Sequence, residues 1–176
     1  MIITGGIYKG RKITAPDEKI TRPTLSKVRQ GVFNTLFSLI GNFEDKSFLD
    51  LFGGSGIMGL EALSRGFEKV DVFEKNTKIA QVLKKNYLTL GLNPNLKIGD
   101  SIKLIEKIEL NYDVIYVDPP YFSGVYEEVF KRLNKYSKSN TIIVAEHSEP
   151  LDIKSFALIK QKNYGGKNIS FFEKNF

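Results

Sequence analysis

Hydrophobic residues alternate along the chain between short apolar runs and stretches at helical spacing. The short runs predict strands at residues 47–52, 69–74, 95–99, 113–118 and 140–147. Apolar residues three and four apart predict helices at residues 28–40, 56–66, 76–91 and 123–135, with a short helix after Asp100. Repeated strand–helix units favour a mostly parallel sheet covered by helices. The pattern therefore predicts an α/β fold.

Both ends of the chain predict antiparallel pairs. The N-terminal stretch "IITGGIYKGRKI" reads as two short strands around glycines, and residues 155–176 read as two strands joined through Gly165 and Gly166. Thr24 or Ser26 is expected to cap the helix over 28–40. Phe33 and Phe37 follow one face of that helix, so both are expected in the core.

The composition limits the possible chemistry. With 176 residues, 41% of them hydrophobic, we expect a single domain, with a basic N-terminal extension at 1–23 and a core at 24–176. The chain has no cysteine and a single histidine, His147, so disulfides and thiol nucleophiles are excluded and no metal site is expected. No signal peptide or membrane span is visible, and a cytoplasmic location is expected.

Positive charge is concentrated at the two ends. The formal charge is +6 overall, but residues 1–30 carry +5, residues 154–176 carry +4, and the middle of the chain carries −3. A basic arm on a neutral or acidic core is typical of a protein that binds a polyanion and holds a cofactor elsewhere. A lysine-rich solvated surface is the alternative reading of the charge alone.

A glycine turn follows the first predicted core strand, in "FLDLFGGSGIMG". Gly54, Gly56 and Gly59 match G-x-G-x-x-G between a strand and a helix, where backbone amides face a ligand. Both dinucleotides and S-adenosylmethionine are bound at such turns. Asp50, just before the turn, would repel a pyrophosphate but could order the loop or hold an ammonium group. It therefore favours the cationic cofactor.

Two more acids end neighbouring predicted strands. Glu74 ends "KVDVFE", where its carboxylate could accept both hydroxyls of a ribose, and Asp100 in "KIGDS" could meet an adenine amino group. Asp100 could equally be a helix N-cap. Because the carboxyl ends of parallel strands converge on one crevice, these acids together indicate a nucleoside site.

The fourth strand end reads "DVIYVDPPYF". Each proline lacks an amide hydrogen and favours extended geometry before it, so Asp118, Pro119, Pro120 and Tyr121 should form a stiff corner rich in acceptors. Asp118 and the Pro119 carbonyl could accept both hydrogens of an exocyclic amine and turn its lone pair towards a sulfonium methyl. Tyr121 would stack on the base. Such a base must be unpaired or flipped out of a helix.

The motifs "DLFGGSGIMGLEALSRG", "VFEK", "GDS" and "DPPY", with the N-terminal "GGIYKGRKI", "TRPT" and "VRQGVFNTLF", resemble the RsmD family of small-subunit rRNA guanine-N2 methyltransferases. The resemblance runs from about residue 3 to residue 146. It implies a class I, Rossmann-like methyltransferase fold, S-adenosylmethionine as cofactor, and a guanine of small-subunit (16S) rRNA as substrate. An assembling subunit is the implied partner, and the enzyme is expected to act as a monomer.

The resemblance also implies roles for individual residues. Those implied to bind the cofactor are Arg22, Thr24, Asp50, Phe52, Gly54, Ser55, Gly56, Glu74, Lys75, Asp100, Ser101 and Asp118. Lys9, Arg11, Lys12 and Arg22 would hold RNA phosphates. The family often has F-A-G-S-G where this chain has "FGGSG", and it tolerates phenylalanine at the place of Tyr121, which favours stacking over a role for the hydroxyl.

Other functions remain open at this point. An oxidoreductase would share the glycine turn but would not explain Asp118 to Tyr121. A DNA adenine-N6 or protein glutamine-N5 methyltransferase could use the same corner to orient an amine. A noncatalytic RNA-binding assembly factor would not need it. His147 is expected to be a structural hydrogen-bonding group, and Glu146, though it should face the crevice, has no assigned role.

Overall fold

A computed structural model describes residues 1–16, 24–120 and 124–175 of the protein. Its five helices in these ranges are α1 (Ser26–Ile40), α2 (Ile57–Ser64), α3 (Thr77–Leu88), α4 (Ser101–Ile105) and α5 (Val125–Tyr136). The strands are β1 (Ser47–Asp50), β2 (Lys69–Glu74), β3 (Asn95–Ile98), β4 (Val114–Val117), β5 (Ile142–His147), β6 (Phe156–Tyr164) and β7 (Lys167–Lys174).

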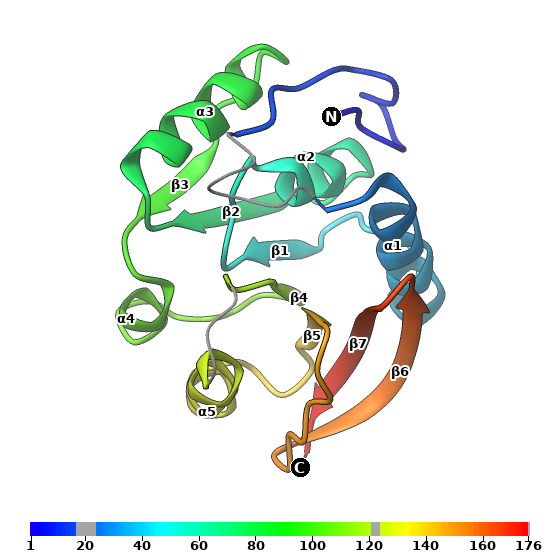
Figure 1. Cartoon of the computed structure of the whole chain (residues 1–176), viewed down its shortest axis with the longest axis vertical. Coiled ribbons are helices and arrows are strands. Elements are labelled where there is room, and N and C mark those ends of the chain that lie inside the picture. Colours follow the sequence, from blue (N-terminus) through cyan, green and yellow to red (C-terminus); the bar gives the residue numbers. More distant parts are fainter. Residues whose placement is uncertain (17–23, 121–123, 176) are drawn as a thin grey trace.

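The seven strands form one sheet in the order β3-β2-β1-β4-β5-β7-β6 (Figure 1). The pairs from β3 to β5 are parallel, whereas β7 is antiparallel to both β5 and β6. The expected mostly parallel sheet with an antiparallel C-terminal hairpin is confirmed. The strand order changes direction between β1 and β4, and ligands of such sheets bind outside the strand ends at this point.

Alternating side chains build a core on each face of the sheet, because neighbours along a strand point to opposite sides. Phe48, Val72 and Val144 pack under α1, α2 and α3. Leu49, Phe73 and Ala145 belong to the opposite cluster, with α4 and α5. Figure 1 shows the two groups of helices on either side of the strands.

The N-terminal stretch pairs with itself more briefly than expected. A single antiparallel bridge joins Ile2 and Lys12, in place of two strands, and the Ile3 amide donates to the Arg11 carbonyl at 3.0 Å. The side chain of Ile3 is fully buried. Residues 1–16 are therefore a packed part of the fold, held against α2 and α3.

Two expectations about α1 are wrong. The N-cap is Leu25, which has no side-chain capping bond, so neither Thr24 nor Ser26 serves as the cap. Phe33 is buried and stacks on Phe48, but Phe37 is 59% exposed. Phe37 lies one full turn from Phe33 at the edge of the apolar face and makes an edge contact with Phe43, with 6.0 Å between the ring centroids.

A buried ion pair ties the N-terminal stretch to the helices. Arg29 of α1 and Glu61 of α2 lie 3.0 Å apart with almost no exposed side chain. Arg29 also donates to the carbonyls of Ile2 and Thr24, and Glu61 accepts from the Thr4 amide at 2.8 Å. Arg29 contributes to the positive charge of residues 1–30, but its side chain is buried and joins α1 to α2 instead of adding to the surface charge.

Candidate functional site

The glycine turn joins β1 to α2 at the predicted place. Gly56 precedes α2 with a φ of 81°, in the left-handed region that glycine enters without strain. A β-carbon there would meet Leu83 and Tyr87 of α3 at 2.8 and 2.9 Å. Gly54 also has a positive φ, and its amide donates to Glu74 at 2.9 Å. The turn thus brings the ends of β1 and β2 together.

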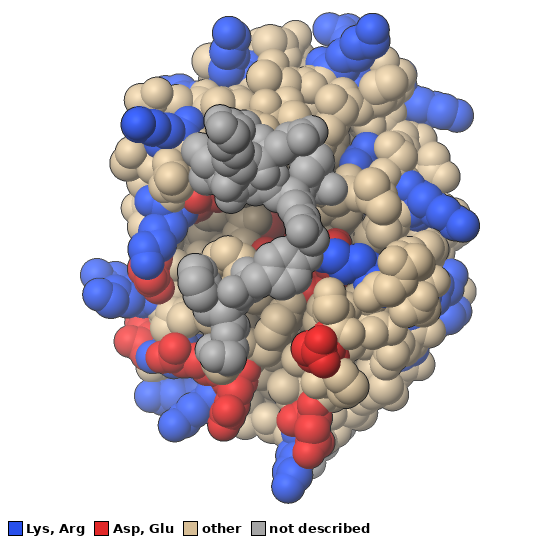
Figure 2. Space-filling model, viewed as in Figure 1, with Lys and Arg blue, Asp and Glu red and all other residues tan. Residues whose placement is uncertain are grey.

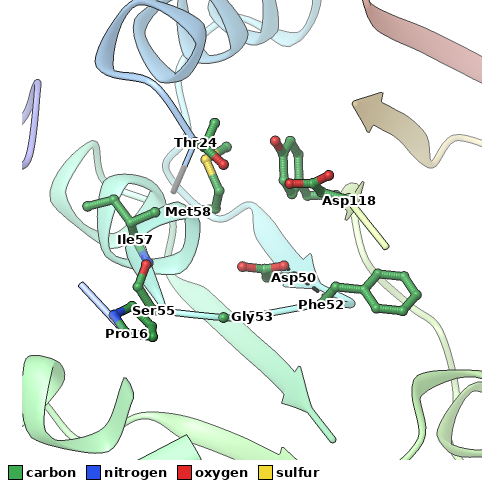
Figure 3. A pocket seen from close by; sticks show the side chains of 11 residues that line it. Pro16, Thr24, Asp50, Phe52, Gly53, Ser55, Ile57, Met58 and Asp118 are labelled. Atoms are coloured by element: carbon green, nitrogen blue, oxygen red, sulfur yellow. Dashed lines mark hydrogen bonds between the residues drawn. The ribbon is translucent and has the colours of Figure 1, made fainter. Parts of the chain in front are cut away.

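A cavity lies over this turn at the switch point between β1 and β4 (Figure 3). Its volume is about 40 Å³. The predicted cofactor residues in its lining are Thr24, Asp50, Phe52, Gly54, Ser55 and Asp118; sequence reasoning missed Pro16, Ile57, Met58 and Tyr116, which also line it. None of these four residues has a side chain that indicates cofactor binding by its type alone, so only the fold reveals them.

Asp50 is the most buried carboxylate of this cavity, with 1% of the residue exposed. Its Oδ1 accepts from the Phe52 amide at 3.2 Å, so the side chain orders the turn. Burial raises the pKa of Asp50 to about 7, and the nearby charge of Glu74 adds to the rise. An acid held so far from water gains strongly from a cationic partner. The Phe52 ring points away from the carboxylate, as Figure 3 shows.

Glu74 and Asp100 lie outside this lining, at the ends of β2 and β3. Besides the Gly54 amide, Glu74 accepts from the Asn76 amide at 2.7 Å. Asp100 is the N-cap of α4, accepting from the amides of Ile102 and Lys103, and it also accepts from Lys75 at 3.0 Å. The N-cap interpretation of Asp100 is therefore confirmed, and the lysine beside it lowers its pKa.

Ser101 lies behind the two strand-end acids. Its hydroxyl donates to the carbonyl of Leu51, so it joins the start of α4 to the glycine turn. Ser101 is buried and Lys75 is largely exposed. Lys75 and Ser101, both predicted to bind the cofactor, therefore lie next to the carboxyl ends of β2 and β3, and Ser101 holds the start of α4 to the glycine turn.

Asp118 follows β4 immediately and is partly buried. Burial and the charge of Glu146 raise the pKa of Asp118 well above its usual value, and the charge of Lys167 opposes the rise. Pro119 is buried and Pro120 is exposed. Tyr121 and Arg22 fall outside the described residues.

A second cavity begins on the other side of Asp118. It is a groove of about 990 Å³, bounded by α5, the end of β5 and the following loop, and the start of β7. Asp118 lines both cavities, and Pro119 lines the groove. The corner predicted from the sequence is therefore the junction between a small buried site and an open groove.

Glu146 and His147 occupy the end of β5. Glu146 is 4% exposed and accepts from the Tyr116 hydroxyl at 2.8 Å and from Lys167 at 2.7 Å. His147 bonds to the Glu149 carbonyl and to the Ser170 hydroxyl, at 2.6 and 2.8 Å, which is the expected structural role. Sequence reasoning missed Lys167, because only the antiparallel return of β7 brings it to this strand end.

The predicted RNA-binding residues Lys9, Arg11 and Lys12 are all exposed, on the N-terminal stretch. The same stretch continues to Thr14, which bonds to Asn86 of α3, and to Pro16 in the small cavity. In Figure 2, basic side chains lie mainly around the rim of the face, and acidic ones lie nearer its middle and lower part. Two carboxylates, those of Asp50 and Asp118, line the small cavity, whereas the three basic residues lie on the exposed N-terminal stretch.

Within residues 1–16, 24–120 and 124–175, no group of three acidic, histidine or cysteine side chains is placed to hold a metal ion. Across the same ranges, no helix is long and apolar enough to cross a membrane.

Comparison with known proteins identifies the family. Residues 1–173 match the family model described as "Conserved hypothetical protein 95". YlbH of Bacillus subtilis is 31% identical over 186 residues, covering 99% of both chains. "Ribosomal RNA small subunit methyltransferase D" of Haemophilus influenzae is 32% identical over 174 residues, covering 93% of this chain and 88% of the relative.

Solved structures show the same fold. The Escherichia coli protein yhhF superposes with a TM-score of 0.85 at 27% identity, over 99% of this chain and 98% of that one. An RNA methyltransferase from Salinibacter ruber, solved with S-adenosyl-L-homocysteine, gives a TM-score of 0.67 at 16% identity, over 87% and 94% of the chains. The fold is that of class I methyltransferases, as expected. The matching family model and the sequence relatives show that the chain belongs to the RsmD family, which contains the ribosomal RNA small subunit methyltransferase D proteins.

Proposed function

We propose that this protein is an S-adenosylmethionine-dependent methyltransferase that methylates the exocyclic N2 amine of a guanine in small-subunit rRNA. The observation that carries the proposal is that Asp118 lines both the small cavity and the groove. A methyl donor on one side and a base on the other would meet at this carboxylate. The names of the sequence relatives support rRNA as the substrate class.

The donor set of the small cavity and the neighbouring strand ends fits the cofactor. The buried carboxylate of Asp50 suits the ammonium of a methionine group, and Glu74 retains acceptor capacity for ribose hydroxyls. Asp100 and Ser101 extend the row of polar groups towards β3. When bound, S-adenosylmethionine supplies an electrophilic methyl group on a sulfonium.

The residues of the corner then orient the acceptor. The Asp118 carboxylate and the Pro119 carbonyl accept the two amine hydrogens, which turns the nitrogen lone pair out of the ring plane towards the small cavity. The new N–C bond forms as the C–S bond breaks, and the released proton passes to Asp118 or to water. A raised pKa suits Asp118 to receive that proton. Most of the acceleration comes from holding the two reactants in line.

The RNA would be held by the surround of the site. Lys9, Arg11 and Lys12 would contact phosphates, while a flipped guanine enters the groove beside α5. Tyr121 would stack on the base. We further propose that the protein acts as a monomer in the cytoplasm, on an assembling subunit, which is the partner that the resemblance implies.

The test compares the modified nucleosides of small-subunit rRNA from cells with and without the gene, by mass spectrometry. We expect the loss of one N2-methylguanosine, its return with the wild-type gene, and no return with Asp118→Asn. Asp45→Asn is the matched control, because Asp45 is exposed and has a φ of 58°, which asparagine tolerates. Unchanged nucleosides in the deletion strain would refute the proposed substrate.

A further inference from the structure

Methyl transfer alone does not explain the ion pair between Glu146, which is buried, and Lys167, which is partly buried. Their oxygen and nitrogen lie 2.7 Å apart, with 4% and 25% of the side chains exposed. Burying such a pair costs desolvation energy that its attraction offsets only in good geometry. The Tyr116 hydroxyl holds the second oxygen of Glu146 at 2.8 Å, and the Tyr126 hydroxyl donates to the Glu146 carbonyl. The carboxylate is therefore fixed in position at the groove.

Three polar groups follow each other across the sheet at the groove. Val117 of β4 pairs with Ala145 of β5. Asp118 and Glu146 are the next residues along these two parallel strands, so their side chains project to the same side of the sheet. Lys167 opens β7, the strand that pairs with β5 on its other side. All three residues are part of the lining of the groove. In the order β4, β5, β7 they present an acceptor, a second acceptor and a cationic donor.

The Watson–Crick edge of guanine has the complementary order. It presents the N2 amine, a donor, then the N1–H, a donor, and then O6, an acceptor. Enzymes that act on a flipped base read this edge by hydrogen bonds. We propose that Glu146 accepts the N1–H and Lys167 donates to O6 of the target guanine, while Asp118 holds the N2 amine. This inference rests on the proposed function and adds the means by which guanine is selected.

The bonding capacity of both groups allows it. A carboxylate offers about four lone-pair sites, of which Tyr116 and Lys167 use two, and a lysine ammonium has three donors. Adenine would present an N1 lone pair to Glu146 and an amine to Lys167, so both contacts would become repulsive or unpaired. A site built to hydrogen-bond its substrate rejects such analogues by about 10⁴-fold or more.

The test uses a base that keeps the reacting amine and changes the rest of the edge. 2,6-Diaminopurine has the N2 amine, but its N1 is an acceptor and an amine replaces O6. Small subunits are reconstituted with guanine or 2,6-diaminopurine at the position mapped by mass spectrometry, and kcat/KM is measured for each. We expect wild-type enzyme to prefer guanine by at least about 100-fold.

Glu146→Gln should lower kcat/KM for guanine by about 100-fold and bring the preference below about 10-fold, because the amide can donate to N1 of 2,6-diaminopurine. Lys167→Met should also narrow the preference, and it serves if the first variant is unstable. Glu68→Gln and Lys160→Met, exposed residues away from the groove, are the matched charge controls. Affinity for S-adenosylmethionine, measured by calorimetry, should stay unchanged in all four.

The outcomes separate the two claims. If folded Glu146→Gln and Lys167→Met slow both bases equally and keep the wild-type preference, the pair is only structural and the inference is overturned, while the proposed function stands. If wild-type enzyme binds S-adenosylmethionine but methylates neither base, the proposed function itself is wrong, and the inference falls with it.

Discussion

At the scale of single residues, burial determines the chemistry of the site. Asp50 and Asp118 both lie in the lining of the small cavity, and burial raises the pKa of each. The raised value means that the folded protein holds these protons more tightly than the unfolded chain. The contribution of Asp50 to stability is therefore lost as the pH rises from 3.8 to about 7. A bound cation would reverse this effect.

We expect the affinity for S-adenosylmethionine to depend on pH through Asp50. Below pH of about 7 the carboxyl is protonated and cannot pair with an ammonium group, so affinity should fall by up to tenfold per pH unit as the pH is lowered. Above that value the affinity should level off. Calorimetric titrations from pH 5.5 to 8.5 measure this dependence.

Asp50→Asn should bind weakly at every pH and show a flat profile between pH 5.5 and 8.5. Asp113→Asn is a suitable control, because Asp113 lies at the opposite end of β4 and bonds to Ser47 and Lys138. A wild-type slope retained by Asp50→Asn would show that another group binds the proton.

At the scale of elements, α1 and α2 are connected by charge. Arg29 and Glu61 link these helices, and the same two side chains hold the backbone of residues 2, 4 and 24. Thr24 lines the small cavity. The ion pair therefore positions both the N-terminal stretch and one wall of the site.

Glu61→Gln should destabilise the protein by about 3 kcal/mol, because it leaves the buried Arg29 without its carboxylate. Urea unfolding measures the free energy of unfolding. Glu106→Gln is the control, since its partner Arg132 is partly exposed and such pairs contribute at most about 1 kcal/mol. Equal losses in the two variants would contradict the special role of the buried pair.

The order of the elements was predictable from the sequence, and so were the acids at the strand ends. Strands and helices can be recognised in a single sequence, because their hydrophobic periodicity depends on residues that are close together along the chain. The exposure of Phe37 was not predictable, since the width of the apolar face depends on what α1 packs against. The pairs Arg29–Glu61 and Glu146–Lys167 join residues 32 and 21 positions apart, and no local pattern indicates them.

At the scale of the whole molecule, charge is divided between the centre and the surround of the site. The acids of the strand ends lie around the cavities, while Lys9, Arg11 and Lys12 lie on the N-terminal stretch outside them. Such an arrangement separates the recognition of a cationic cofactor from that of a polyanion. The sequence predicted both parts but not their relative placement, which follows from the packing of residues 1–16 on α2 and α3.

Replacing Lys9, Arg11 and Lys12 together with glutamine should weaken RNA binding and its dependence on salt. Each lost phosphate contact lowers the slope of log K against log salt by about 0.7 to 0.9, so the loss of three contacts should lower it by about 2 to 3. Binding to small-subunit rRNA between 50 and 200 mM salt measures it. The same change at Lys84, Lys103 and Lys107, three exposed lysines on or near α3 and α4, is the control. Equal slopes in both triple variants would exclude a specific role for the N-terminal stretch.

The most direct measurement is a crystal structure of the protein with S-adenosylmethionine. We expect the amino-acid end of the cofactor beside Asp50, the ribose at Glu74, and the sulfonium methyl directed at the corner of Asp118 and Pro119, open to the groove. A methyl group directed away from that corner, or a cofactor bound elsewhere, would contradict methyl transfer at Asp118.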